Sequence, residues 1–456
     1  MNTVDFHYKK MTETPVSKLI LKLGIPTTIS MLITNIYNLA DTYFVGGLGE
    51  SAQASTGILF TLQAIIQAFA FMLGHGSGTY VSKALAQKDQ NEAKRYASTA
   101  FFTGGAIGLV MLTFGLLFLT PLVKALGSTE TIIPHAKDYG FWVLIGCPFL
   151  ICSLILNNNL RYEGMAFYAM FGLTAGGILN ILGDYVLIKL CHMGVYGAGL
   201  ATAVSQIVSF VILLILYLKK SSAKISVKAV TFKWVVHANI IKGGLPSLIR
   251  QGLSSISSGL LNNLTKPFGD AAIAAISVVN RFSMFVMAIG LGIGQGFQPV
   301  AAFNYSAKKY DRVKKGLVFT WAFSTALVSL ISLLGIIFAE QIIWIFQKAP
   351  EVIAIGKTAL RFSCIGLIFL ASSVAANMLF QSIRKSLIAS ILATMRSGLM
   401  LIPVLIIGYS LKGLLGIQAA QGIADVLSGL VSIPFAIAFL RKDFSKEELL
   451  QEPENL

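Results

Sequence analysis

The sequence predicts an all-α polytopic membrane protein, with twelve transmembrane helices in two pseudo-twofold-related six-helix bundles around a central cavity. Three observations predict this fold class: the composition, the spacing of long apolar segments, and an internal repeat. Of the 456 residues, 55% are hydrophobic and only 12% are charged. So little polar side-chain surface cannot cover a soluble globule, whereas it is typical of a membrane protein.

The apolar segments divide the chain into twelve predicted spans of about 20 residues or more, the length that a helix needs to cross a bilayer. In chain order they lie at 18–44, 53–79, 96–122, 137–159, 168–190, 195–218, 240–264, 271–299, 316–339, 353–380, 386–410 and 414–440. The residues before the first span lack the basic stretch and apolar run of a cleavable secretory signal. The first span itself is therefore expected to direct insertion.

The basic residues between the spans predict the topology. Twenty-five lysines and arginines fall in the alternate connections on one side, which also holds both termini, and seven fall on the other. Because cytoplasmic loops carry the excess of basic residues, both termini are expected in the cytoplasm of a plasma (inner) membrane protein. The net charge of +16 is thus explained by topology and does not indicate nucleic-acid binding.

The second half of the chain repeats the first at a shift of 220 positions. LGIP at 23–26 corresponds to GGLP at 243–246, and GESAQA at 49–54 corresponds to GDAAIA at 269–274. Six spans return the chain to its starting side, so the repeat is parallel and a cavity is expected between the halves. The predicted units are an N-terminal lobe at 1–218, a basic interfacial linker at 219–239, a C-terminal lobe at 240–440 and a cytoplasmic tail at 441–456.

Three carboxylates fall deep inside the spans, at Asp41, Asp184 and Asp425. An acid in hydrocarbon is by default an ion or proton site, although it can also cap a broken helix or pair with an arginine. Asp425 has Gln421 one turn before it, and for this acid both interpretations stay open. Its half also contains all the arginines placed inside spans, namely Arg250, Arg281, Arg361 and Arg396, of which Arg250 is close enough to the cytoplasmic end to snorkel.

The two acids of the first half have oxygen-bearing neighbours at helical spacing. Tyr37 precedes Asp41 by one turn, Asn180 precedes Asp184 by one turn, and Thr202 lies in the sixth span. Carboxylate, amide and hydroxyl oxygens are the ligands that a hard monovalent cation prefers. Two acids close together also disfavour double ionisation, so a proton is the alternative occupant. We predict that Asp41 and Asp184 share one site.

Several of these motifs together resemble the multidrug and toxic compound extrusion (MATE) transporters. The motifs are GIP in the first span, NLADTYFVGGLG at 38–49, the glycine-rich end of the second span, and LNILGDYVLI at 179–188 followed by GVYGAGLATAVSQ at 194–206. In the branch of this family with a first-half (N-lobe) cation site, the matching positions Asp41, Asn180, Asp184 and Thr202 bind the coupling ion, a sodium ion or a proton. Other branches place acids on the seventh, eighth and tenth helices, where this chain has none.

The resemblance implies a substrate cavity and a bending first helix. The candidate cavity residues combine polar, aromatic and methionine side chains: Tyr37, Gln63, Gln67, Asn157, Met284 and Met287. Methionine and aromatic groups repack around varied organic shapes, and an acid in the wall favours cations. Ordinary helix packing explains any single one of these residues equally well. Pro26, inside the first span, is the expected hinge.

The remaining motifs exclude other functions. The five histidines are scattered, with no HExxH or GxSxG, so an enzyme is not indicated, and the absence of a Walker A motif excludes ATP as the energy source within the chain. The four cysteines form no CxxC pair and indicate packing rather than a metal site or disulfides. We expect a monomeric, cofactor-free antiporter that exports organic, cationic compounds in exchange for Na+ or H+. A lipid-linked oligosaccharide flippase of the same wider superfamily is the alternative.

Overall fold

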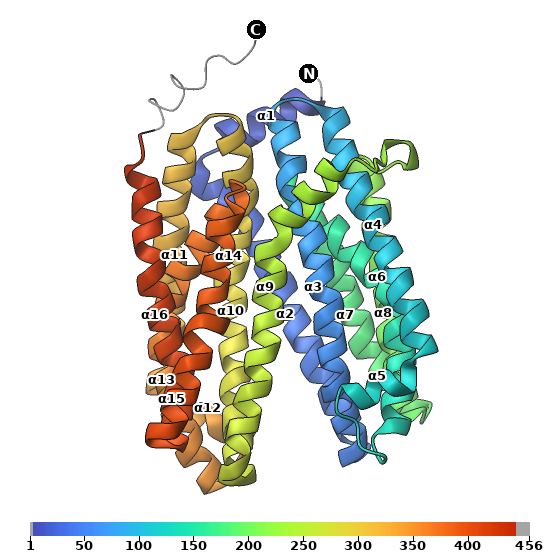
Figure 1. The fold of residues 1–456 in the computed structure, drawn as a ribbon, viewed down its shortest axis with the longest axis vertical. Coiled ribbons are helices and arrows are strands. Elements are labelled where there is room, and N and C mark those ends of the chain that lie inside the picture. The colour runs from blue at the N-terminus through green and yellow to red at the C-terminus, as the bar shows by residue number, and fades with distance from the viewer. Residues whose placement is uncertain (1–2, 444–456) are drawn as a thin grey trace.

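The computed structural model describes residues 3–443, which form helices joined by short connections and contain no strand. The two lobes stand side by side, and the described ends of the chain lie at the same end of the molecule (Figure 1). We call this the terminal end. The first lobe contains α2 (Val16–Gly46), α3 (Glu50–Ala86), α4 (Gln90–Leu117), α6 (Ile133–Tyr162), α7 (Ala166–Asp184) and α8 (Gly194–Lys220). The second contains α9 (Trp234–Thr265), α10 (Gly269–Ser306), α11 (Tyr310–Ile337), α13 (Pro350–Ser382), α14 (Ser386–Thr394) with α15 (Leu401–Lys412), and α16 (Leu414–Arg441).

The twelve predicted spans are confirmed, with longer helices than the apolar segments alone indicated. Eleven helical runs in the described chain are long and apolar enough to cross a membrane, and one of them, 234–306, contains both α9 and α10 joined by a 3-10 turn at Lys266–Phe268. The helices extend beyond the predicted ends because their polar continuations still pack against neighbours. For example, α3 continues past residue 79 through the buried side chains of Val81 and Ser82.

Five smaller elements were not predicted. They are the N-terminal helix α1 (Thr3–Glu13), the short helices α5 (Leu119–Ala125) and α12 (Ala339–Phe346), and π-helical turns at Tyr185–Leu190 and Met395–Met400. The sequence placed the first residues of α5 and α12 in the preceding spans, because a hydropathy window does not register a change of helix direction.

The internal repeat is visible in matching hydrogen bonds. Asn157 donates its side-chain amide to the carbonyl oxygen of Ala169 over 2.8 Å, and Asn377 donates to Ala389 over 2.7 Å, each pair lying 220 positions from its equivalent. Two equivalent turns also share left-handed backbone geometry, at Lys88 and Lys308, with φ of 62° and 58°. The two lobes therefore share local structure as well as sequence.

The lobes contact each other where two helix pairs cross. Helix α2 crosses α10 at Gly24 and Gly296, and α9 crosses α3 at the repeat-equivalent Gly244 and Gly76. A Cβ atom at Gly296 would overlap the backbone of Gly24, so these crossings require the close approach that only glycine permits. Farther from the terminal end, residues 31–44 of α2 are half-buried or exposed. The tight contact between the lobes is thus concentrated toward the terminal end.

Helix α1 connects both lobes at the terminal end (Figure 1). Lys10 donates to the carbonyl oxygen of Gly164 in the first lobe over 3.0 Å, and Arg312 of the second lobe donates to the carbonyl oxygen of Thr14 over 2.6 Å. Burial lowers the pKa of His7 to about 4, with a smaller effect from nearby Lys10. His7 therefore packs in α1 as a neutral ring against Phe303.

The connection between the lobes runs from Lys220 to Trp234 and contains only a 3-10 turn at Val227–Ala229. It is held to the first lobe by Glu163, which accepts hydrogen bonds from the Ser221 hydroxyl over 2.6 Å and the Ser222 backbone amide over 2.8 Å. The predicted basic linker therefore includes the first residues of α9. The predicted tail begins at the end of α16, and its residues 444–456 lie outside the described chain.

Candidate functional site

Asp41 lies five residues before the end of α2, in the half of this helix that is far from the terminal end, and it is half-buried. The Tyr139 hydroxyl on α6 donates to the Oδ2 atom of Asp41 over 2.9 Å, and its oxygen lies 3.5 Å from the Thr202 hydroxyl. Tyr139 is a site residue that the sequence analysis missed. A tyrosine near the start of an apolar segment has no distinguishing spacing. Only the tertiary arrangement, in which α6 and α7 pack against α8 and α2 packs against α7, brings it to the acid.

Asn180 and Asp184 lie one turn apart on α7, facing the lobe interior. Their exposed fractions are 2% and 0%. Asn180 donates its side-chain amide to the Thr202 hydroxyl on α8 over 3.2 Å. Directly after Asp184 the α-helix changes to the π-helical turn Tyr185–Leu190. Such turns are rare and occur frequently at functional sites.

The structure therefore brings the four predicted cation ligands into one region of the first lobe, where Tyr139 and Thr202 connect α2 to α7. Asp41 and Asp184 are 143 positions apart in the chain. Tyr139 contacts both Asp41 and Thr202, and Thr202 accepts from Asn180, which lies one turn before Asp184. This arrangement depends on α2 packing against α7 and on α7 packing against α8. The small residue Gly177 permits the first contact, since a Cβ atom there would lie 2.9 Å from Ile33 and 3.2 Å from Tyr37.

Four buried oxygens of this cluster have no hydrogen-bond donor among the described residues. They are Asp41 Oδ1, Asn180 Oδ1, and both carboxylate oxygens of Asp184. A buried carboxylate without a donor or counter-ion is strongly unfavourable, so the cluster is suited to take up a positive charge. Within the described chain no group of three histidine, cysteine or acidic side chains is placed to hold a metal. The donor set, two carboxylates with neutral oxygens, instead suits a proton or a hard monovalent cation.

One charged residue lies elsewhere than the sequence analysis expected. Arg161 falls between the predicted spans 137–159 and 168–190, and so counted among the basic residues of a connection. It lies instead in the last turn of α6 and is 2% exposed. It donates to Asn158 over 2.6 Å and to Gln295 of the second lobe. Its partners are neutral residues at the contact between the lobes, so it does not neutralise the two acids.

In the second lobe, Asp425 forms an ion pair. The Arg396 Nε atom donates to Asp425 Oδ1 over 2.7 Å, and Gln421 donates to the same oxygen over 3.0 Å. Asp425 is 1% exposed and its hydrogen-bonding capacity is well used. Of the two interpretations left open by the sequence, the geometry matches pairing with an arginine.

The six predicted cavity residues do not form one group. Tyr37, Gln63, Gln67 and Asn157 belong to the first lobe, whereas Met284 and Met287 lie on α10 of the second. Gln63 is buried, and the amide of Asn157 is used by Ala169. Met284 is 45% exposed, and its carbonyl oxygen accepts from Asn35 of α2 over 3.3 Å.

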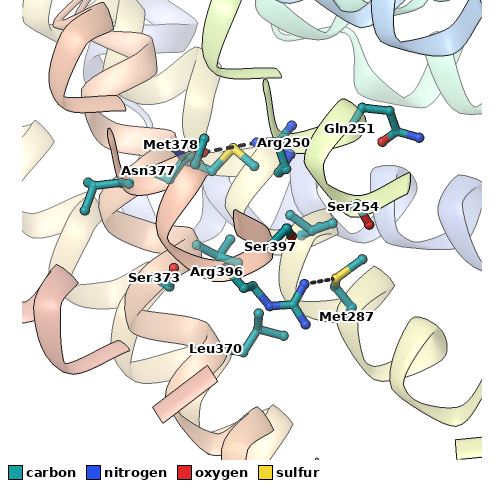
Figure 2. Close-up of a pocket in the computed structure, with 14 residues that line it drawn as sticks. Arg250, Gln251, Ser254, Met287, Leu370, Ser373, Asn377, Met378, Arg396 and Ser397 are labelled. Atoms are coloured by element: carbon teal, nitrogen blue, oxygen red, sulfur yellow. Dashed lines mark hydrogen bonds between the residues drawn. The ribbon is translucent and has the colours of Figure 1, made fainter. Parts of the chain in front are cut away.

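Met287 lines a cavity of about 80 Å³ inside the second lobe (Figure 2). The cavity lies between α9, α10, α13, α14 and the π-helical turn before α15, and two arginines, Arg250 and Arg396, line it. By its position in the sequence, Arg250 is close enough to the cytoplasmic end of its span to snorkel. The structure instead places it half-buried on this cavity, bonded to Asn377.

The sequence family agrees with this architecture. Residues 26–186 and 246–407 both match the MatE family model, and together they include more than half of the chain. The chain belongs to the MatE family. The two matches begin 220 positions apart, which is the shift of the internal repeat.

Individual members of the MatE family are similar over almost the whole chain. The multidrug export protein MepA of Staphylococcus aureus (strain NCTC 8325 / PS 47) is 27% identical over 441 residues, covering 94% of this chain and 95% of the relative. MepA of Staphylococcus saprophyticus is 26% identical, with 96% and 97% covered. A solved structure described as the outward-facing conformation of a multidrug resistance MATE family transporter of the MOP superfamily is 23% identical, with a TM-score of 0.88 and 96% and 99% covered.

The function of this MatE chain follows at the level of the family. It is a multi-pass membrane protein and a multidrug efflux antiporter that exports small organic compounds, and it is not an enzyme. The flippase alternative is not favoured, because the two relatives described above are named as multidrug export proteins.

Proposed function

We propose that the antiporter couples export to the entry of Na+ or H+ at Asp41, Asn180, Asp184 and Thr202. The observation that carries this proposal is the group of four buried acceptor oxygens without donors. A sodium ion or a proton would satisfy the same oxygens, so the two cations are alternative occupants of one site. Tyr139 holds one oxygen of Asp41 and orients the other toward the site.

A shared cation would connect α2 to α7 and α8, and so bias the conformation of α2. Asp41 lies 15 positions after Pro26, or about 22 Å along a helix. Pro26 in turn lies two positions after Gly24, where α2 crosses α10. Bending at this proline would therefore change the lobe contact when the ion exchanges, and we propose Pro26 as the hinge.

The proposed orientation places both termini in the cytoplasm of the plasma (inner) membrane. The excess of basic residues on that side supports it, and moving Arg161 into α6 leaves the asymmetry almost unchanged. The close crossings of the two lobes would then lie at the cytoplasmic end, and the half-buried or exposed residues 31–44 of α2 would lie toward the outer side. The proposed unit is a monomer of two lobes, 1–218 and 240–440, with the linker at 219–239, because the cation site and the cavities are each formed within one chain.

The proposed substrates include organic cations. Asp41 and Asp184 in the first lobe are bonded to no basic residue of the described chain, which makes that side of the molecule favourable for positive charge. Tyr37, Gln67 and Asn157 are half-buried there and can contact a compound between the lobes.

The proposed coupling is tested with purified protein in proteoliposomes. Efflux of a cationic dye is measured under an inward sodium gradient at equal pH, and then under an inward proton gradient without sodium. Acceleration by either gradient, lost in Asp184→Asn, is the expected result. Gradient-driven efflux that persists in Asp184→Asn would overturn the assignment of the site. Acceleration by one gradient alone identifies the coupling ion.

A further inference from the structure

The cavity of the second lobe has a polar wall that carries positive charge. Its fourteen lining residues include Arg250 and Arg396 but no acid. Figure 2 shows the two arginines on the same cavity, with Ser254 and Met287 along its side. The rest of the wall is mainly aliphatic, with Leu291, Leu370 and Val374.

Arg250 is fixed in place by neutral partners. It donates to Asn377 Oδ1 over 3.0 Å and lies 3.5 Å from the Ser247 hydroxyl. Asn377 presents its oxygen to the arginine because its own amide is held by the Ala389 carbonyl. No described carboxylate bonds to Arg250. A guanidinium has five N–H donors, so this arrangement orients the group and leaves both its charge and some donors available.

Arg396 contributes a donor but little net charge. Its charge is compensated by the ion pair with Asp425, and its Nη1 atom contacts the Met287 sulfur over 2.8 Å. Sulfur is a weak acceptor, which a stronger acceptor can replace.

The repeat shows that this charge is particular to the second lobe. At a shift of 220, Arg250 corresponds to Ser30 on α2, whereas Asp41 corresponds to Leu261 on α9. The supporting asparagine is present in both lobes, as Asn157 and Asn377. The first lobe thus has this asparagine and acids, whereas the second lobe has this asparagine and an arginine bonded to it.

We propose that the second-lobe cavity binds the carboxylate of an exported organic compound, at Arg250 and the Nη1 atom of Arg396. The aliphatic wall would contact the adjoining ring. The cavity is too small for a whole dye, so the rest of the compound would lie between the lobes. The two arginines would then recognise one functional group, the carboxylate, wherever an exported compound carries it. This inference rests on the export function and assigns a subsite within it.

A matched pair of dyes tests the proposal directly. Rhodamine 110 carries a free carboxylate, and rhodamine 123 is its methyl ester, with the same cationic ring system. Binding to the purified chain is measured by fluorescence anisotropy at pH 7.5, without any ion gradient. Arg250→Gln should weaken binding of the acid about 10-fold or more, since a hydrogen bond to a charged group contributes about 1.5–3 kcal/mol. The affinity for the ester should stay within about 3-fold, which corresponds to well under 1 kcal/mol.

Control variants separate this effect from folding and from bulk charge. Arg250→Lys keeps the charge and should retain much of the affinity for the acid. Arg361→Gln removes an exposed arginine from α13, outside the cavity, and should change neither dye's affinity. On the wild-type chain, 1-naphthoate should compete with the acid dye at concentrations where chloride and phosphate do not. This measurement needs no variant to fold.

Each contrary result is distinct. Equal loss of both dyes in a monodisperse Arg250→Gln variant, unchanged binding of the acid, or equal effects of Arg361→Gln would overturn the proposal. If chloride or phosphate competed as effectively as naphthoate, the cavity would be a general anion site, and the proposal of a carboxylate site would also be overturned. In proteoliposomes, export of the ester without export of the acid would contradict the proposal while leaving the antiport function intact. Failure to export either dye would count against the antiport function instead.

Discussion

Tyr139 on α6 donates its hydroxyl hydrogen to Asp41 on α2 over 2.9 Å, and its oxygen also lies 3.5 Å from Thr202 on α8. Among the described residues, Tyr139 is the only side chain that donates a hydrogen bond to Asp41, and Asp184 accepts none. It joins three helices at the point where the candidate ligands converge. Tyr139 therefore positions the carboxylate of Asp41 in addition to packing.

Tyr139→Phe is expected to lower the affinity for the coupling ion about 10-fold. The substitution keeps the ring and removes one hydrogen bond to a charged group, worth about 1.5–3 kcal/mol. Ion binding is measured by isothermal titration calorimetry on the purified chain. Tyr37→Phe is the matched control, because Tyr37 lies one turn from Asp41 and makes no hydrogen bond to either acid in the described chain. Equal losses in both variants would argue against a positioning role.

Asp41→Asn and Asp184→Asn are expected to affect ion affinity non-additively. If one cation contacts both carboxylates, the first substitution removes most of the binding and the second has little left to remove. The measurement is a double-mutant cycle of ion affinities with these two substitutions. Asp425 is not part of the cycle, because it is paired with Arg396. Additive losses would mean that the two acids act at independent sites. Asp184→Asn alone should abolish coupled efflux while the protein still inserts and folds.

Pro26→Ala is expected to reduce turnover more than substrate binding. Alanine restores the backbone hydrogen bond that proline lacks and removes the ring clash, so α2 should bend less readily. Transport rate and dye affinity are measured on the same preparation. Pro246→Ala is the control, since Pro246 is the equivalent proline in α9, on the lobe without the acid pair. Unchanged turnover, with a normal conformational response to the ion, would exclude a hinge at this position.

Gly296→Ala is expected to weaken the contact between the lobes at the terminal end. Its Cβ would overlap the Gly24 backbone, and overpacking of a tight contact costs about 1–3 kcal/mol. The distance between spin labels on the terminal ends of α3 and α10 should increase or broaden. Gly252→Ala in α9 is the control, because a Cβ there meets no atom within 4 Å. An unchanged distance distribution would show that the crossing does not limit the closed arrangement.

Glu163 is expected to make stability depend on pH near neutrality. Burial raises its pKa to about 7, although hydrogen bonds from Ser221 and Ser222 oppose the rise. The pKa of Glu163 in the folded protein lies above the unfolded value of 4.5. Its contribution to folding stability is therefore complete below pH 4.5 and is lost as the pH rises through 7. The change is at most on the order of 3 kcal/mol.

The measurement is the melting temperature between pH 5 and pH 8. The wild type should lose stability relative to Glu163→Gln over this range. Glu130→Gln, at a side chain that is 85% exposed, is the control and should follow the wild type. Parallel curves for the wild type and Glu163→Gln would show that the linker contact at Ser221 and Ser222 does not depend on ionisation of Glu163.

Most residues of the proposed first-lobe site could be named from the sequence. Asp41 and Asp184 were identifiable because a carboxylate inside an apolar segment is rare, and Asn180 was identifiable from its helical spacing. Tyr139 was not, because its contribution depends on the packing of three helices. The short helices α5 and α12 were missed for a related reason, since hydropathy measures apolar length and not direction.

The sequence by itself determined the membrane class, the twelve spans and the two-lobe repeat. These features depend on local properties: apolar length sets the spans, and six spans per repeat set the parallel relation. The tertiary structure decided which charges meet. Asp425 pairs with Arg396, whereas Arg250, on the same lobe, faces a cavity with neutral partners only. Charges interact over a few ångströms in space, and positions 29 or 127 residues apart along the chain come within that range only when the helices pack.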